Sequence, residues 1–261
     1  MLYANNISAQ VGSKCLLNNV DFYVKPKEVI VIVGPNGAGK SSLLKALCGD
    51  IKLTQGSILL DEQPLHTYTV EDLATRRAVL TQNYELDFPF TVSEVVDMSH
   101  FAHQMQYSRQ TLKEFSNQAI EALGITHLKD HTFTQLSGGE KQRVQLARVL
   151  CQIQPTLKIN KPAYLLIDEP TSSLDIFHQY DVMAQAKNIA QQGAGVVAVI
   201  HDLSLAASFA DRIYMINNGV IEATGLPEEV LTAERLKHVY NINAQLNNSV
   251  PNMLPHIQIS C

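Results

Sequence analysis

The sequence predicts an α/β fold built around a parallel sheet, and two observations support this prediction. Three short runs are almost wholly apolar and rich in β-branched residues, at 29–33, 164–167 and 196–200. Runs without polar alternation are typical of strands covered on both faces, as in a parallel sheet flanked by helices. Each run is followed at once by a chemically distinctive segment, beginning at Gly34, Asp168 and His201. Because ligands bind beyond the carboxyl ends of such strands, these segments are expected to meet at one site.

The rest of the chain is expected to add a small antiparallel β subdomain and an inserted helical subdomain. Segments 1–25 and 56–60 are predicted to supply strands of the antiparallel sheet. One helical face carries four apolar residues before a stop at Gly124, namely Leu112, Phe115, Ala119 and Leu123. We therefore predict a single domain over 1–261, with a core in 1–82 and 156–261 and a helical part in 83–155.

Composition and charge exclude several classes of protein. The 261 residues are 46% hydrophobic, which is enough for a core and excludes a disordered chain or a disulfide-stapled mini-fold. The net charge is −5, so we expect no nucleic-acid partner. The four cysteines lie far apart without a Cys-x-x-Cys pair, which argues against a zinc site and fits a reducing compartment. No secretory signal begins the sequence, and no stretch approaches the roughly 18 apolar residues of a membrane span, so a cytosolic location is expected.

The first glycine-rich segment matches the phosphate-binding P-loop pattern, Gly-x-x-x-x-Gly-Lys-Ser, between a predicted strand and a predicted helix. The predicted phosphate-binding residues are Gly34, Pro35, Asn36, Gly37, Ala38, Gly39, Lys40, Ser41 and Ser42. The glycines allow backbone N–H groups to point at anionic oxygens, and the helix N-terminus adds partial positive charge. Lys40 is expected to contact the β- and γ-phosphates of ATP, and Ser41 to ligate Mg²⁺. The alternative, a turn with an incidental lysine, fits this context poorly, so the core is predicted to be a P-loop NTPase (RecA-like) core.

The residues after the second and third apolar runs suit phosphate chemistry. Asp168 is placed to reach the same Mg²⁺, and Glu169 to orient and deprotonate the attacking water, a contribution of roughly 10²–10⁴ in rate. The alternative for Glu169 is a structural charge at a helix start. His201 is expected to contact the γ-phosphate, and its alternative is a hydrogen-bonded histidine of the core.

A second anion site is predicted at residues 136–140, which precede another helix. Ser137 and Glu140 have capping-box spacing, so the helix start is well defined. Gly138 and Gly139 leave its first backbone N–H groups uncovered, although glycine costs about 1 kcal/mol against alanine in a helix. Because the sequence has one P-loop, this site is expected to bind a nucleotide held by another copy of the chain. The prediction is a head-to-tail homodimer with two ATP molecules at its interface.

The ordered set of motifs resembles that of the ATP-binding cassette (ABC) ATPases over essentially the whole chain. The motifs are the P-loop, Gln82 after a strand, 136–140, 164–169, 173–175 and His201. The resemblance implies that Gln82 contacts Mg²⁺ or water and reports the γ-phosphate to a partner. It also implies that Ser137, Gly138 and Gly139 bind the γ-phosphate of the partner protomer. Asp175 would lie at the dimer interface, Glu169 would be the general base, and His201 would be the switch.

Two positions depart from the pattern of the ABC ATPases. Val11 lies 23 positions before Gly34, where these proteins usually stack an aromatic ring on adenine. A valine offers apolar contact without stacking, and Tyr3 and Tyr23 are weaker candidates for that role. Lys27 replaces the usual turn glycine, so it is expected to be mildly strained if the turn requires a positive φ.

Among ABC ATPases, the sequence favours a subunit that energises a membrane transporter. Translation-associated members carry two cassettes, and chromosome-maintenance members insert a long coiled coil, whereas 53 residues separate Gln82 from Leu136 here. ATP hydrolysis must then be delivered to separate permease subunits. The apolar residues expected to line the docking cleft are Phe88, Pro89, Phe90, Val92, Val95 and Val96, although Phe88 and Phe90 could instead close the core of the helical part.

The segment 80–96, the stretch 154–162 and the tail 219–230 resemble the iron-siderophore, haem and vitamin B12 importer group, most closely its haem (hemin) importers. This resemblance implies two copies of the chain, two permeases and a periplasmic binding protein, with the ATPase on the cytoplasmic face of the inner membrane. Import of a siderophore or vitamin B12 is one alternative, and a soluble regulator without a permease is another. The nine histidines do not cluster in the manner of a haem site.

Overall fold

The computed structural model describes residues 1–81, 86–169, 176–247 and 256–260. The chain forms two compact units, residues 1–67 with 197–261, and residues 68–196.

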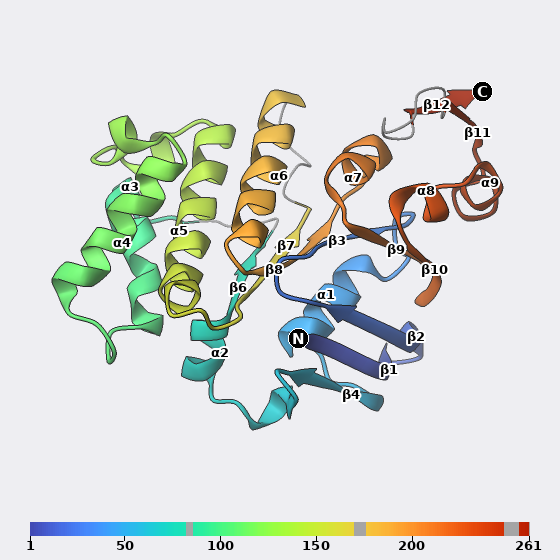
Figure 1. Cartoon of the computed structure of the whole chain (residues 1–261), viewed down its shortest axis with the longest axis horizontal. Helices are drawn as coiled ribbons and strands as arrows, with labels where there is room; N and C mark the ends of the chain where they lie inside the picture. Colours follow the sequence, from blue (N-terminus) through green and yellow to red (C-terminus); the bar gives the residue numbers. More distant parts are fainter. Residues whose placement is uncertain (82–85, 170–175, 248–255, 261) are drawn as a thin grey trace. The chain divides into compact units, whose positions relative to one another are not determined.

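The first unit contains the antiparallel sheet expected from the sequence (Figure 1). Its strands are β1 (Leu2–Val11), β2 (Lys14–Val24), β4 (Gln55–Leu60) and β5 (Gln63–Pro64), in the order β2-β1-β4-β5, and the 3₁₀ helix η1 (Leu65–Thr67) follows. All the pairings in this sheet are antiparallel. After β2, Lys27 adopts φ +68°, which confirms that this turn requires the left-handed conformation.

The first unit also holds the strand that leads into the P-loop. β3 (Val29–Val33) is buried along its whole length and pairs in parallel with β9 (Arg212–Asn217), which pairs antiparallel with β10 (Val220–Gly225). The ring centroids of Phe22 on β2 and Tyr214 on β9 are 4.5 Å apart in the core. The other elements are α1 (Lys40–Cys48), α7 (Leu203–Phe209), α8 (Pro227–Val230), α9 (Ala233–Tyr240), β11 (Asn243–Asn247) and β12 (His256–Ser260).

The second unit is mainly helical. Its helices are α2 (Val70–Arg76), α3 (Val92–Asp97), η2 (Met98–Ala102), α4 (Arg109–Ala122), η3 (Thr126–Leu128), η4 (Phe133–Gln135), α5 (Gly138–Lys158) and α6 (Ile176–Gln191). Helices α4, α5 and α6 lie side by side (Figure 1). The predicted apolar face of α4 is buried, and Gly124 follows its end at φ +65°. Helix α5 continues through Pro155, so the connection to the next strand is confined to 159–163.

The parallel strands of the second unit are β6 (Arg77–Leu80) and β7 (Tyr164–Asp168), which pair directly. The chain continues from α6 into β8 (Gly195–Val199), which is buried along its whole length. The three apolar runs of the sequence are β3, β7 and β8, and their lack of polar alternation corresponds to complete burial of their apolar residues. In the part of the chain that the structure describes, no helix is both long enough and apolar enough to cross a membrane.

Candidate functional site

The P-loop is held in shape by close backbone packing within the first unit. A β-carbon at position 34 would lie 2.2 Å from the carbonyl oxygen of Ile216, and one at position 39 would lie 2.8 Å from that of Leu16. Glycine is therefore required at both positions, because larger residues would displace backbone of β9 or β2. At Gly37, by contrast, a β-carbon would meet nothing within 4 Å. The loop thus packs against backbone of β9 and β2 on one side and is open at Gly37.

The side chain of the P-loop lysine, Lys40, folds back onto the loop. Lys40 is 4% exposed, and its Nζ donates to the carbonyl oxygens of Gly34 at 2.8 Å and Pro35 at 3.0 Å. Helix α1 begins here without a side-chain cap, because its N-cap is Gly39. Backbone N–H groups and a buried cation are thus gathered at one helix start, which is the arrangement that binds phosphate.

His201 lies beside the P-loop strand. It directly follows Ile200, whose N–H donates to the carbonyl oxygen of Ile32 at 3.2 Å, two residues before Gly34. The His201 side chain is exposed. Asp202 caps α7 by accepting from the N–H groups of Ser204 and Leu205 at 2.7 and 2.9 Å. The exposure excludes the alternative of a histidine enclosed in the core.

Asp168 and Glu169 occupy the end of β7 in the second unit. Ile167 is fully buried and Asp168 half-buried, so the chain reaches the surface here. Glu169 adopts φ +47°, a left-handed conformation that costs on the order of 1–3 kcal/mol for a residue other than glycine. Backbone strain of this kind clusters at functional sites. The sequence did not reveal this feature, because a glutamate carries no local signal for a positive φ.

The helix start at 137–140 has the capping box expected from its spacing. The N–H and Oγ of Ser137 donate to Glu140 Oε2 at 2.8 and 2.7 Å, and the N–H of Glu140 donates to Ser137 Oγ at 3.4 Å. The side-chain and backbone hydrogen bonds from Ser137 lower the pKa of the Glu140 carboxyl. A β-carbon at Gly138 would meet nothing within 4 Å. The first turn of α5 is therefore capped by hydrogen bonds and open at Gly138.

For the remaining predicted site residues, the structure says little about their roles. Gln82 and Asp175 lie outside the described residues. Val11 ends β1 with 66% of its side chain exposed, so it is accessible for an apolar contact. The ring of Tyr23 is covered by the Arg212 guanidinium at 3.8 Å, which makes it a poor substitute for stacking on adenine.

The expected docking residues are only partly exposed. Val92, Val95 and Val96 are fully buried, so their assignment to an exposed cleft was wrong; they form the inner face of α3. Phe88 is 71% exposed and lies 6.0 Å from the Phe90 ring, so it does not close the core of the helical part.

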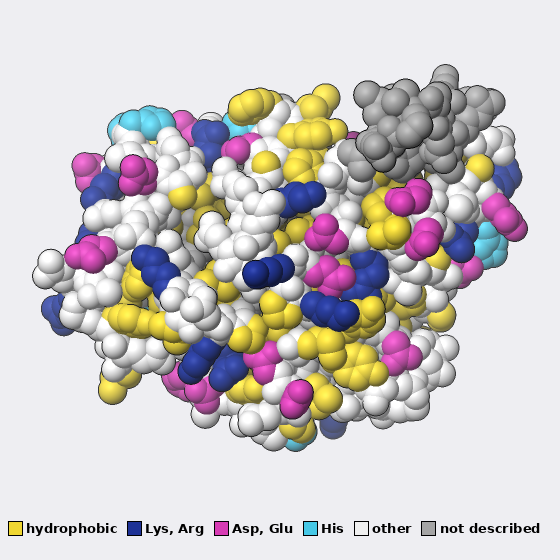
Figure 2. Space-filling model, in the orientation of Figure 1, with side chains coloured by type: hydrophobic (Ala, Val, Ile, Leu, Met, Phe, Trp, Pro, Cys, Tyr) yellow, Lys and Arg dark blue, Asp and Glu magenta, His cyan; other side chains and the backbone are white. Residues whose placement is uncertain are grey.

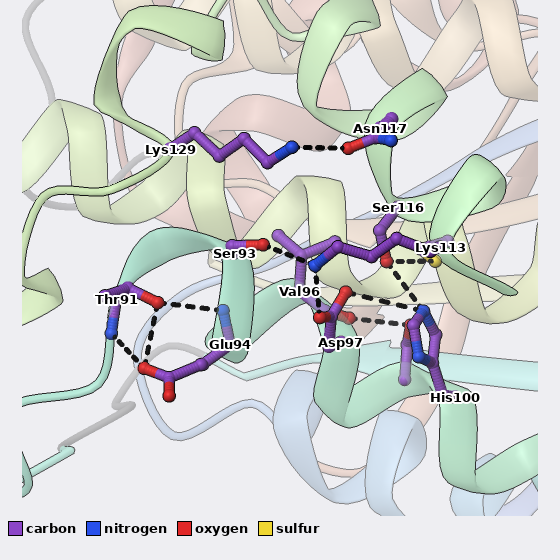
Figure 3. Close-up of polar contacts among 12 residues, drawn as sticks. Thr91, Ser93, Glu94, Val96, Asp97, His100, Lys113, Ser116, Asn117 and Lys129 are labelled. Atoms are coloured by element: carbon purple, nitrogen blue, oxygen red, sulfur yellow. Dashed lines mark hydrogen bonds and ion pairs between the residues drawn. The ribbon is translucent and has the colours of Figure 1, made fainter. Parts of the chain in front are cut away.

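A polar cluster fixes α3, η2 and α4 to one another (Figure 3). Lys113 Nζ donates to Asp97 Oδ2 at 2.6 Å and to Ser93 Oγ at 2.7 Å. His100 Nε2 lies 2.7 Å from Ser116 Oγ and 3.5 Å from Asp97 Oδ1. These three residue types suggest a hydrolytic triad, but one ring nitrogen faces both partners and Ser116 is fully buried. Burial lowers the pKa of His100.

Tyr240 is a P-loop contact that the sequence did not reveal. Burial raises the pKa of its hydroxyl well above the ordinary value, and a hydrogen bond with the backbone of Gly34 offsets part of that rise. Tyr240 is the last residue of α9, about 200 positions from the P-loop. Nothing in its local sequence links it to a glycine so distant along the chain.

Comparison with known proteins identifies the family of the chain. The family model described as ABC transporter matches residues 17–172, a span that includes the P-loop, the 136–140 turn and β7. The chain belongs to the ABC transporter family. The α/β fold predicted from the sequence, with its antiparallel and helical parts, is the fold of the ABC ATPases.

Relatives of this ABC transporter protein include hemin import proteins. It is 72% identical over 259 residues to the hemin import ATP-binding protein HmuV of Pseudoalteromonas translucida, covering 99% of both chains. It is 41% identical to HmuV of Hahella chejuensis, covering 98% of this chain and 96% of that one.

Solved ABC transporter structures share the fold. One is an inward-facing conformation of a putative metal-chelate type ABC transporter, with a TM-score of 0.81 and 24% identity, covering 100% and 97% of the two chains. Another is a dimeric ATP-binding cassette in a post-hydrolysis state bound to ADP and Pi, with a TM-score of 0.73 and 26% identity, covering 87% and 99%.

Proposed function

We propose that this ABC ATPase powers hemin import across the bacterial inner membrane. The observation that carries this proposal is 72% identity, over 99% of both chains, to a hemin import ATP-binding protein. The P-loop geometry supports the ATPase part, because Lys40 and the uncapped start of α1 form a phosphate-binding arrangement.

Each predicted site residue has a role in this proposal. The P-loop backbone and Lys40 hold the ATP phosphates, His201 contacts the γ-phosphate, and Glu169 orients and deprotonates the attacking water. The metal-binding residues are Ser41, Gln82 and Asp168, whose oxygen ligands suit Mg²⁺. When bound, the ion would neutralise charge on the phosphate oxygens.

The active assembly is proposed to be a homodimer. Ser137, Gly138 and Gly139 bind the γ-phosphate held by the partner, and Asp175 lies at the interface. The open position at Gly138 supports this role, as does the dimeric cassette of similar fold. Hydrophobic side chains also gather at the tip of α6, where Ile176 and Phe177 are 75% and 73% exposed (Figure 2). Apolar exposure of this kind is suited to burial against a second copy.

The dimer is proposed to act at the cytoplasmic face of the membrane, as a peripheral subunit docked on two permeases. The exposed Phe88 and the neighbouring Phe90 would contact the permease. A periplasmic binding protein would deliver the substrate to the opposite side, so this subunit would not contact hemin.

The test of the ATPase mechanism is Glu169→Gln. We expect this variant to bind ATP, lose turnover by roughly 10²–10⁴-fold and accumulate as an ATP-bound dimer, because the general base is removed while the phosphate site is kept. Hydrolysis assays and size-exclusion chromatography with ATP would measure these effects. Glu121→Gln, an exposed position on α4, is the matched control. Near-normal hydrolysis by Glu169→Gln would exclude Glu169 as the base.

The test of the substrate is growth with hemin as sole iron source, with and without this gene. Loss of growth that is restored by the gene supports hemin import. Loss confined to siderophore or vitamin B12 use would support those alternatives. Copurification with a polytopic membrane protein is also expected, and its absence would favour a soluble regulator.

A further inference from the structure

The two glycines of the signature turn, residues 136–140, have different surroundings. A β-carbon at Gly138 would meet nothing within 4 Å. A β-carbon at Gly139 would lie 3.2 Å from Cδ2 and 3.3 Å from Nε2 of His178. Such distances are too short for ordinary carbon contacts, so the ring would have to move by a few tenths of an ångström. Position 139 is therefore a glycine because His178 of the same chain occupies the space that a side chain would need.

His178 reaches the signature turn from the start of α6. It is the third residue of that helix and is half-buried. Its ring also packs against Phe177, with centroids 5.4 Å apart and planes at 87°. Asp175, the predicted interface residue, is only three positions before His178 in the sequence. His178 therefore contacts the signature turn from a segment that is itself predicted to lie at the dimer interface.

We propose that His178 is a positioning residue for the signature turn. Its imidazole packs on Gly139 and holds the first turn of α5, so that the open side at Gly138 faces the partner's nucleotide. The proposal rests on the proposed function in one respect, namely that this turn binds the partner's γ-phosphate. Gly139 is then a glycine because of His178, and Gly138 is a glycine because of the nucleotide.

The experiment is a double-mutant cycle in the Glu169→Gln background, with the ATP-dependent dimer dissociation constant as the readout. Gly139→Ala and His178→Ala are each expected to weaken the dimer on the order of tenfold. The double variant is expected to be no weaker than His178→Ala alone, because removing the ring makes room for the new methyl group. Gly138→Ala should weaken the dimer in both backgrounds, since its clash would be with the partner's nucleotide.

Controls separate this role from a general loss of stability. Thermal unfolding and ADP affinity of the monomer report the fold and the P-loop, and both should stay at the parental level in His178→Ala. His66→Ala, at an exposed histidine of η1, is the matched control and should leave the dimer constant unchanged.

Several outcomes would overturn the proposal. An equal penalty for Gly139→Ala with and without His178 would show that the ring does not explain this glycine. A His178→Ala variant with parental dimer affinity would exclude the positioning role, as would one whose weaker dimer is matched by lost ADP binding or lower thermal stability. If the parental Glu169→Gln protein forms no ATP-dependent dimer, the proposed trans site fails as well, whereas the first results leave that site intact.

Discussion

The P-loop and the signature turn are both glycine-rich turns at helix starts for which we propose anion binding, but their glycines have opposite surroundings. The P-loop glycines 34 and 39 press against backbone of their own unit, and α1 begins without a side-chain cap. The signature turn has a complete capping box between Ser137 and Glu140, while Gly138 faces open space. The difference supports our proposal that the P-loop holds the phosphates within one chain, whereas the open side of the signature turn at Gly138 contacts a partner.

The largest effect is expected from placing alanine at one glycine of each site. Gly34→Ala should destabilise the fold by about 1–3 kcal/mol and abolish ATP binding, because the methyl group would displace the backbone of β9. Gly138→Ala should leave monomer stability and ATP binding nearly unchanged but reduce ATP-dependent dimerisation. Thermal unfolding and nucleotide titrations measure both. Equal losses of monomer ATP binding in the two variants would contradict the contrast between the sites.

A smaller effect is expected at the capping box. Glu140→Gln can keep hydrogen bonds to Ser137 while removing a negative charge from the proposed phosphate site. We expect tighter ATP-dependent dimerisation. We also expect the free energy of unfolding at neutral pH to fall by about 0.3–1 kcal/mol, because a negative charge near a helix N-terminus is stabilising. Dimer dissociation constants and denaturant unfolding give the two values. Weaker dimerisation would show that the carboxylate assists the anion site.

The capping box also predicts a dependence of stability on pH. The folded-state pKa of Glu140 lies below the ordinary value of 4.5, because Ser137 donates hydrogen bonds to its carboxylate. The ionised carboxylate therefore contributes stability that is fully present above pH 4.5. This contribution is lost as the pH falls through the lowered folded-state pKa. The free energy of unfolding, measured from pH 6 downward, should therefore fall less steeply in Glu140→Gln than in the parent protein. An unchanged acid profile would exclude the contribution.

The smallest effect is expected at the predicted adenine contact. Val11→Tyr replaces an exposed valine, so the fold should tolerate it. If Val11 lies under adenine, stacking would add about 0.5–1.5 kcal/mol and tighten ATP binding several-fold. Titrations with ATP and with inorganic triphosphate separate stacking from phosphate contacts. The same gain for triphosphate would argue against an adenine contact at this position.

The sequence predicted the elements whose signals are local. The buried strands β3, β7 and β8 were predicted from unbroken apolar runs, and the capping box from the spacing of Ser137 and Glu140. The valines of α3 were wrongly predicted to be exposed. A short apolar segment does not reveal which of its side chains face the core, and α3 turns Val92, Val95 and Val96 inward.

By itself, the sequence determined the α/β class, the P-loop and the capped signature helix, because each depends on residues close together along the chain. Only the tertiary structure decided which glycines are required for packing, since Ile216, Leu16 and His178 approach positions 34, 39 and 139 from distant segments. It also decided that Glu169 is held at a positive φ and that Tyr240 contacts the P-loop. Steric exclusion and hydrogen bonding act over a few ångströms in space, and no pattern along the chain records which remote atoms folding brings that close.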